Sequence, residues 1–216
     1  MLVLADLDNT LAAPGEPVAQ RIRQLMQGHV VVTGAVWGTT LTRFGGGAYI
    51  LAQNGQDACD PDSHSLWRND MSLSDVEEAL RDAERLVGHP LHDDQVQVRG
   101  CQVSVSMVGH SAEWGVKQNY DPTGDKRRML LAMSPCPSLE RFIGGTTCID
   151  YLPKGAGKGP AIERLIKMLG RDPAECMYLG DHFGVGGNDA SVLGVVPCTY
   201  VRNHEEAAVI IEGALR

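Results

Sequence analysis

The 216-residue sequence predicts an α/β fold: a doubly wound, mostly parallel sheet with an α+β module inserted into it. The start of the chain carries a β–α–β pattern, with apolar runs at 2–4 and 30–32 on either side of an amphipathic stretch at 18–27. Units of this kind build parallel sheets with helices on the faces. The middle of the chain instead alternates apolar and polar residues as antiparallel strands do. Strands and helices alternate again after residue 153.

The first core segment is expected to span residues 1–56. Gly28 follows the first amphipathic stretch, where a glycine can adopt the left-handed conformation that ends many helices. The elements expected next are a strand at 30–32, a short helix at 39–44 and a strand at 49–52.

Residues 57–150 are expected to form the inserted α+β cap. Residues 56–69 are polar and predict irregular structure, whereas 73–87 predict a helix capped by Ser72 or Ser74. A hairpin is expected at 95–108 because apolar and polar residues alternate on both sides of Gly100. The other expectations are a loop at 109–125, helices at 128–134 and 138–142, and a strand at 146–152.

The second core segment is expected at residues 151–216. A glycine-rich loop at 153–159 opens a predicted helix at 160–169, with Pro160 suited to its first turn. The remaining predictions are a strand at 177–179, a short helix from 188 to 193, a strand at 195–201 and a closing helix at 205–215.

Composition excludes several classes of protein. The net charge of −8 and the absence of a dense Lys/Arg run argue against nucleic acid or an anionic membrane as partner. No apolar run is long enough to span a bilayer, and no signal peptide is apparent. The six cysteines are scattered without a CxxC pair, which predicts free thiols in a reducing compartment rather than disulfides or a zinc site. We therefore expect a cytoplasmic protein.

Asp6 and Asp8 follow the first predicted strand, at the edge of a parallel sheet where ligands bind. Two carboxylates so close repel each other unless a cation lies between them, and Mg²⁺ prefers oxygen ligands. The alternative is a strand that ends in a polar turn and a helix cap.

Three further polar groups fall at the same predicted edge: Thr33, Lys158 and Asp181, the last followed by Asn188 and Asp189. Taken singly, each can be explained by structure alone: Thr33 as a helix cap, Lys158 as a solvated lysine and Asp181 as a turn residue. The glycine-rich loop is not a Walker-type phosphate loop, because it lacks the GK[ST] spacing. Together on one edge, these groups predict a functional site.

The order of four motifs resembles the haloacid dehalogenase-like phosphohydrolase superfamily, in the branch whose α+β cap follows the third core strand. The resemblance covers the whole chain and rests on DLDNTL at 6–11, VVVTG at 30–34, GKG at 157–159 and GDHFGVGGND at 180–189.

Two members of that superfamily share further patterns with the chain. Residues 152–165 are similar to sucrose-phosphate phosphatase, whereas 186–189 and 103–110 are similar to eukaryotic phosphomannomutases. His110 stands where the mutases carry a phosphate-binding arginine.

The resemblance implies a phosphomonoester hydrolase acting on a sugar phosphate or similar small phosphorylated metabolite. Asp6 would be the nucleophile that forms an aspartyl-phosphate, and Asp8 the general acid and base. Thr33 and Lys158 would hold the phosphoryl oxygens. Lys154 is the alternative for this role. We prefer Lys158 because Lys158 directly precedes the predicted helix.

The resemblance also implies a Mg²⁺ ion. It would be held by the Asp6 carboxylate, the Asp8 backbone carbonyl and Asp181. Asn188 and Asp189 would orient Lys158 or a water molecule on the metal.

Substrate selection is expected from the cap and from residues beside the motifs. Trp114 and Tyr120 could stack on a sugar, although packing of the loop is the simpler reading. Charged candidates in the cap could equally be ordinary surface residues. The candidate substrate-binding residues are Asn9, Gly34, Arg99, His110, Lys117, Arg127 and Arg128.

Two other functions stay open. A phosphosugar mutase would use the same aspartyl-phosphate, but it must also bind a second phosphate tightly. The presence of His110 in place of an arginine weakens the case for a mutase. A non-catalytic binding protein of the same fold need not retain Asp6, Asp8, Lys158 and Asp181 together.

Overall fold

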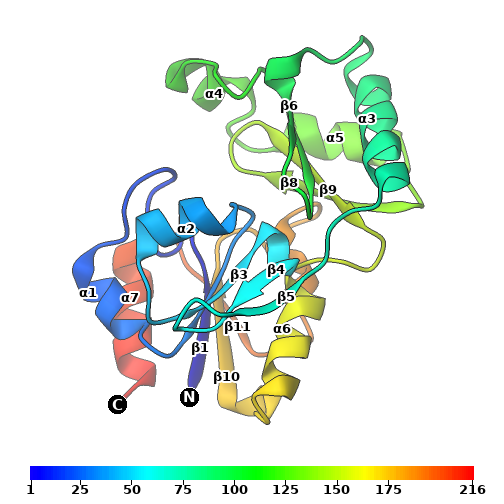
Figure 1. Ribbon diagram of the computed structural model, residues 1–216. Coiled ribbons are helices and arrows are strands. Elements are labelled where there is room, and N and C mark those ends of the chain that lie inside the picture. The colour runs from blue at the N-terminus through cyan, green and yellow to red at the C-terminus, as the bar shows by residue number, and fades with distance from the viewer.

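In the computed structural model, which describes residues 1–216, the chain forms two sheets, one above the other in the view of Figure 1. The larger sheet has seven strands in the order β11-β10-β1-β2-β3-β4-β5. These strands are β1 (Leu2–Asp6), β2 (Val30–Val32), β3 (Tyr49–Ala52), β4 (Asp57–Cys59), β5 (Ser65–Arg68), β10 (Cys176–Gly180) and β11 (Cys198–Tyr200).

The sheet is doubly wound around β1, which pairs in parallel with β10 on one side and with β2 on the other. Val3 and Ala5 face one apolar core, with α1 (Gln20–Leu25) and α7 (His204–Ala214). Leu2 and Leu4 face the opposite core, with α6 (Lys158–Met168). Burying both faces of one strand explains why its residues are almost all apolar. The predicted α/β class is confirmed.

The second sheet is antiparallel, in the order β6-β7-β9-β8. Its strands are β6 (Val96–Val98), β7 (Val103–Ser106), β8 (Leu139–Gly144) and β9 (Cys148–Pro153). Helices α3 (Leu73–Val87) and α5 (Asp125–Met133) pack on one face of this sheet, against Val103, Val105, Ile149 and Tyr151. Because side chains alternate along a strand, Ser104 and Asp150 point to the other face, toward the large sheet.

The expectation that residues 56–69 are irregular was wrong. They contain β4 and β5, which extend the large sheet with antiparallel pairs. Trp67 is buried there, and its indole N–H donates to the Gly55 carbonyl at 2.9 Å. Strands of three and four residues with polar composition give little periodicity to detect. Since these residues pair with the core sheet, we propose that the cap begins after β5 rather than at residue 57.

Two other elements differ from the sequence prediction. Residues 138–142 were expected to be helical, but 139–142 belong to strand β8, which pairs with β9 along six residues. Here pairing across the sheet overrides local helical preference. The expected loop at 109–125 contains the short helix α4 (Trp114–Tyr120).

The other helix of the core is α2 (Trp37–Phe44), which follows β2 and packs through Trp37 and Leu41 on side chains of β3 and β4. Figure 1 shows it close to β3. The capped helix predicted at 73–87 is confirmed, and the Ser72 side chain accepts a hydrogen bond from the Asp75 backbone N–H at 3.1 Å. No helix of the chain combines the length and apolarity that crossing a membrane requires.

Candidate active site

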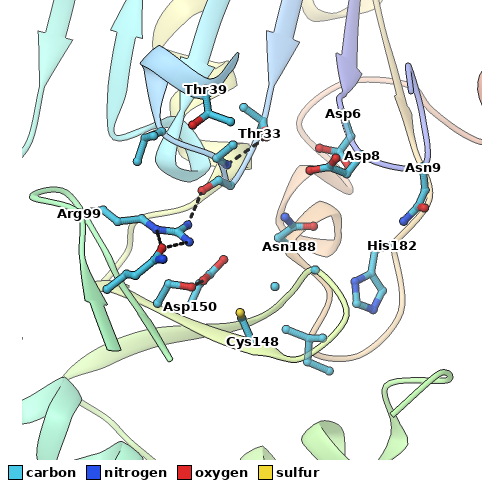
Figure 2. Close-up of a pocket in the computed structure, with 18 of the residues that line it drawn as sticks. Asp6, Asp8, Asn9, Thr33, Thr39, Arg99, Cys148, Asp150, His182 and Asn188 are labelled. Atoms are coloured by element: carbon cyan, nitrogen blue, oxygen red, sulfur yellow. Dashed lines mark hydrogen bonds between the residues drawn. The ribbon is translucent and has the colours of Figure 1, made fainter. Parts of the chain in front are cut away.

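A cavity of about 640 Å³ lies between the carboxyl-terminal edge of the large sheet and the polar face of the second sheet. Figure 2 shows Asp6 and Asp8 on one side of it, with Asp150 and Cys148 across from them. The structure therefore brings the two sheets together around one site. Its polar lining residues include Asp6, Asp8, Asn9, Thr33, Arg99, Ser104, Asp150, Asp181, His182 and Asn188.

Lys158 lies fully buried beneath this cavity, at the first turn of α6. Its Nζ donates to Asp6 Oδ1 at 2.7 Å and to Asp189 Oδ1 at 2.8 Å. Burial alone would lower the pKa of Lys158, but the carboxylates of Asp189 and Asp6 raise it above its usual value. The two carboxylates therefore favour the charged ammonium, which joins residues from the two core segments. Lys154, its alternative in the sequence analysis, is exposed and pairs with Glu140.

Both carboxylate oxygens of Asp189 accept hydrogen bonds within the protein. Besides Lys158, it accepts hydrogen bonds from the Tyr178 hydroxyl at 2.5 Å and the His182 backbone N–H at 3.0 Å. Burial would raise the pKa of Asp189, but Lys158 and these hydrogen bonds lower it. An ionised carboxylate with three donors fixes the position of Lys158 and has little capacity left for a metal. Tyr178 has no counterpart in the sequence analysis, where it is only an apolar strand residue.

Asp6 and Asp181 are less well compensated. Burial, together with the neighbouring carboxylates, raises the pKa of Asp6 well above its usual value despite Lys158. Burial and the charge of Asp189 raise the pKa of Asp181 to about 6. Oxygens of Asp6, Asp181 and Asp189 lie within 4.8 Å of one another. When ionised, three carboxylates against one ammonium leave two negative charges, which suits a divalent cation with oxygen ligands.

Asp8 also lines the cavity, and it has a cationic neighbour that the sequence analysis missed. Nη1 of Arg43 lies 2.8 Å from Asp8 Oδ1. Arg43 is itself buried, and it donates from Nε to the Glu16 carbonyl at 2.9 Å and from Nη2 to the Ala13 carbonyl at 3.1 Å. The sequence does not single out Arg43. Arginines are common in the last turn of a helix, where they interact favourably with the helix dipole.

Thr33, Asn9 and Asn188 all line the cavity. The Thr33 hydroxyl accepts from the Ala35 N–H at 3.1 Å, so its own proton stays available to a ligand. Asn9 donates to Asp181 Oδ2 at 3.1 Å, and it has the positive φ of 60° that lets its side chain turn back to the site.

Amide side chains connect the second sheet to the core at Gly34. Its carbonyl accepts from Gln102 Nε2 at 3.0 Å and from Arg99 Nη1 at 3.4 Å. Asn54 donates to Gln102 Oε1 and accepts from Asn188 Nδ2, both at 3.1 Å. These contacts hold the cap against the core on the side of the cavity that carries Arg99.

Asp150 is a site residue that the sequence analysis did not select. It is buried on β9, accepts a hydrogen bond from Ser104 Oγ at 2.6 Å, and has a pKa raised by burial despite the nearby Arg99. The alternation of apolar and polar residues at 146–152 could have identified Asp150 from the sequence. An acidic residue on the polar face of a cap strand points toward the core.

The remaining cap candidates do not share one environment. Arg99 lines the cavity, but His110 does not, and its Nε2 lies 3.2 Å from the Ser104 carbonyl. Lys117 Nζ donates to the His110 carbonyl, and Arg128 pairs with Asp125.

Arg127 is buried, and its guanidinium has partners within the cap. Its Nε donates to Asp121 Oδ2 at 2.9 Å, and its Nη1 donates to the carbonyls of Gly144 and Gly145 at 3.0 Å. These contacts hold the loop between β8 and β9, which forms part of the cavity wall. They indicate a structural role in place of the substrate contact considered from the sequence.

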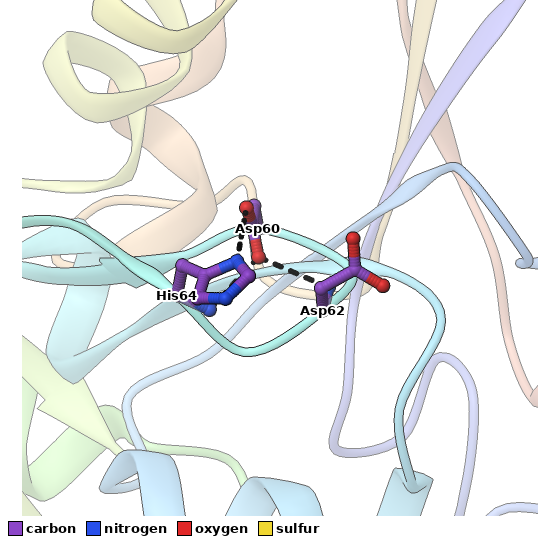
Figure 3. Close-up of side chains that lie close together, drawn as sticks. All are labelled: Asp60, Asp62 and His64. Carbon is purple, nitrogen blue, oxygen red and sulfur yellow. Dashed lines mark hydrogen bonds and ion pairs between the residues drawn. The ribbon is translucent and has the colours of Figure 1, made fainter.

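A second group of possible metal ligands, Asp60, Asp62 and His64, lies in the turn between β4 and β5 (Figure 3). Asp60 Oδ1 accepts from the backbone N–H groups of Asp62 at 3.0 Å and His64 at 2.8 Å. This is the hydrogen bonding of an ordinary turn.

We expect Arg127→Met to destabilise the protein by about 3 kcal/mol, because it leaves the buried Asp121 carboxylate without its partner. Arg128→Met, beside it on α5, should change stability by less than about 1 kcal/mol because its pair is exposed. Urea unfolding followed by circular dichroism measures both. A stable Arg127→Met protein that binds substrate poorly would contradict the structural role.

Comparisons with known proteins by sequence find two kinds of relative. The HMP-PP phosphatase of Yersinia pestis is 26% identical over 179 residues, which cover 72% of this chain and 63% of that protein. The phosphomannomutase of Dendrobium officinale is 23% identical over 219 residues, covering 89% of this chain and 84% of that protein. The chain thus matches less than two thirds of the length of the HMP-PP phosphatase. No family model matches the chain.

Comparison with solved structures finds the same fold at low sequence identity. An N-terminally truncated IMP-nucleotidase from Plasmodium falciparum aligns with a TM-score of 0.69 at 14% identity, covering 100% of this chain and 70% of that one. A haloacid dehalogenase-like hydrolase from B. subtilis aligns with a TM-score of 0.68 at 14% identity, covering 98% and 99%. Another from Bacteroides thetaiotaomicron gives 0.63 at 14% identity, covering 98% of both.

Proposed function

We propose that this chain, which has the fold of the haloacid dehalogenase-like hydrolases, is a Mg²⁺-dependent phosphatase that hydrolyses a sugar phosphate or similar small phosphorylated metabolite through an aspartyl-phosphate. The observation that carries this proposal is the buried Lys158 bridging Asp6 and Asp189 beneath a polar cavity. A charged lysine is costly to bury, and its position suits the stabilisation of phosphoryl oxygens.

The carboxylates of Asp6 and Asp181, with the Asp8 backbone carbonyl, would hold Mg²⁺. This assignment is supported by the excess negative charge of the buried cluster and by the engagement of Asp189 elsewhere. When bound, the ion would neutralise charge on the phosphoryl group and help to orient it.

In the first step, the oxygen of Asp6 not bonded to Lys158 attacks phosphorus. The bond from phosphorus to the leaving oxygen breaks, and Asp8 gives that oxygen a proton. In the second step, Asp8 takes a proton from water as the water oxygen attacks phosphorus, and the bond to Asp6 breaks to release inorganic phosphate. Lys158 and the Thr33 hydroxyl hold phosphoryl oxygens throughout, and Asp189 keeps the ammonium in place.

A phosphosugar mutase is the second candidate, because the phosphomannomutase relative covers more of the chain than the phosphatase relative does. A mutase must bind a second phosphate during each cycle. Among the residues that line the main cavity, Arg99 is the single Lys or Arg, and the Asp150 carboxylate lies near it. This balance of charge favours the hydrolase. A requirement for a sugar bisphosphate activator would instead identify a mutase.

We expect Asp6→Asn to lower phosphate release by at least about a thousandfold, because the amide cannot act as the nucleophile. The experiment compares phosphate release from a panel of sugar phosphates, with circular dichroism to verify folding. Asp62→Asn, in the turn of Figure 3, is the matched control and should keep full activity. Turnover retained by Asp6→Asn would rule out the proposed nucleophile.

Removal of divalent cations with EDTA should abolish phosphate release, and added Mg²⁺ should restore it. Mg²⁺ at about 100 times its dissociation constant should also stabilise the folded protein by about 2.7 kcal/mol. Asp181→Asn should remove most of that stabilisation, because it removes one anionic ligand. A thermal shift on adding Mg²⁺ measures this without any substrate. An equal shift in wild type and Asp181→Asn would place the ion elsewhere.

Arg43→Met should slow the hydrolysis of alkyl phosphates by about tenfold, because Arg43 fixes Asp8, the proposed proton donor. p-Nitrophenyl phosphate has a leaving group that needs no proton, so its hydrolysis should change much less. Arg23→Met, an exposed arginine on α1, is the control. Equal losses for both kinds of ester would indicate that Arg43 acts only on the structure of the loop.

A further inference from the structure

A second cavity of about 430 Å³ adjoins the first. It lies between α4 of the cap and the loop that follows β1 in the core, with Pro14 on the core side and Trp114 on the cap side. The two cavities share five lining residues, so they meet beside the proposed phosphoryl site. The shared residues are Asp8, Asn9, Gly145, Asp181 and His182.

Trp114 and Gln118 form the wall of this cavity on α4. They are four residues apart and therefore lie on the same face of the helix. Trp114 is 50% exposed and belongs to none of the apolar clusters of the protein, and α4 contains no buried residue. The indole is therefore not used to pack the helix. A large aromatic surface left open at a cavity wall is available to a ligand.

The charges of the second cavity disfavour a second phosphate as its ligand. Arg127 is the one Lys or Arg in its lining, and that guanidinium is bonded to Asp121 and to backbone carbonyls. The two carboxylates at the junction, Asp8 and Asp181, would repel another anion. Neutral donors and acceptors remain on Gln118 and Thr146, whereas the Thr123 hydroxyl donates to Asp125 and can only accept from a ligand. An aromatic face beside an amide suits an uncharged planar ring with polar atoms on its edge.

We propose that the second cavity binds a planar heteroaromatic ring carried by the leaving group of the substrate, stacked on Trp114 and hydrogen-bonded by Gln118. The inference rests on the proposed function, because it requires the phosphoryl group to lie at Asp6. Asp8, the proposed proton donor to the leaving oxygen, lines both cavities, so the leaving group would lie next to their junction. A simple sugar phosphate would occupy the first cavity and leave Trp114 uncovered.

The test compares esters that differ only in the ring. Adenosine 5′-monophosphate and uridine 5′-monophosphate carry a base on the sugar, whereas ribose 5-phosphate does not. For wild type with Mg²⁺, we expect kcat/KM at least about tenfold higher for one of the nucleotides, as expected for one stacked base. Trp114→Ala should remove this advantage through a higher KM and leave ribose 5-phosphate unchanged. Trp114→Phe should retain most of it, and Val116→Ala, an exposed α4 residue outside the lining, should have no effect.

A binding experiment separates failure of this inference from failure of the proposed function. Titration of Asp6→Asn with each nucleotide and with ribose 5-phosphate, followed by calorimetry, should give tighter binding of a nucleotide that Trp114→Ala abolishes. Ring-dependent binding without turnover by wild type would overturn the hydrolase and support the ring subsite. Hydrolysis of all three esters with equal kcat/KM, or an equal loss for all three in Trp114→Ala, would overturn the ring subsite and leave the hydrolase in place.

Discussion

The ion pairs of Lys158 with Asp6 and Asp189 are the contacts on which the candidate site depends. They join the first strand of the chain to a helix that begins more than 150 residues later, at a depth where Lys158 and Asp189 have no exposed surface. Removing one member of a buried ionic group leaves the others uncompensated and costs several kcal/mol. Burying these charges also costs free energy because it removes them from water, and the adjoining cavity is where the proposed phosphatase would use them.

The carboxylates around Lys158 differ in how their charges are compensated. Asp189 accepts hydrogen bonds from Lys158, Tyr178 and a backbone N–H, so it holds Lys158 in position. Asp6 and Asp181 retain free oxygens, and burial raises the pKa of both, so a bound cation would favour their ionised forms. The three carboxylates of this cluster thus differ in their environments because their hydrogen-bond donors differ.

The cap contributes a surface with two kinds of chemistry. The polar face of its sheet brings Ser104 and Asp150 to the main cavity, because α3 and α5 cover the opposite face. Helix α4 instead has no apolar anchor and presents Trp114 to the second cavity. The positions of Ser104 and Asp150 depend on the alternation of side chains along the strands of a packed sheet. The position of Trp114 depends on where the short helix α4 lies relative to the core.

The sequence by itself determined the α/β class and the edge at which Asp6, Asp8, Thr33 and Asp181 meet. Buried parallel strands are continuous apolar runs, and polar groups at their ends must share one edge. Tertiary structure alone decided the strands at 57–68, the strand at 139–144 and the neighbours of Asp8 and Asp189. Those strands are held by pairing with distant segments, and Arg43 and Tyr178 reach the carboxylates through space. No local pattern records such contacts, because their free energy comes from partners far apart in the chain.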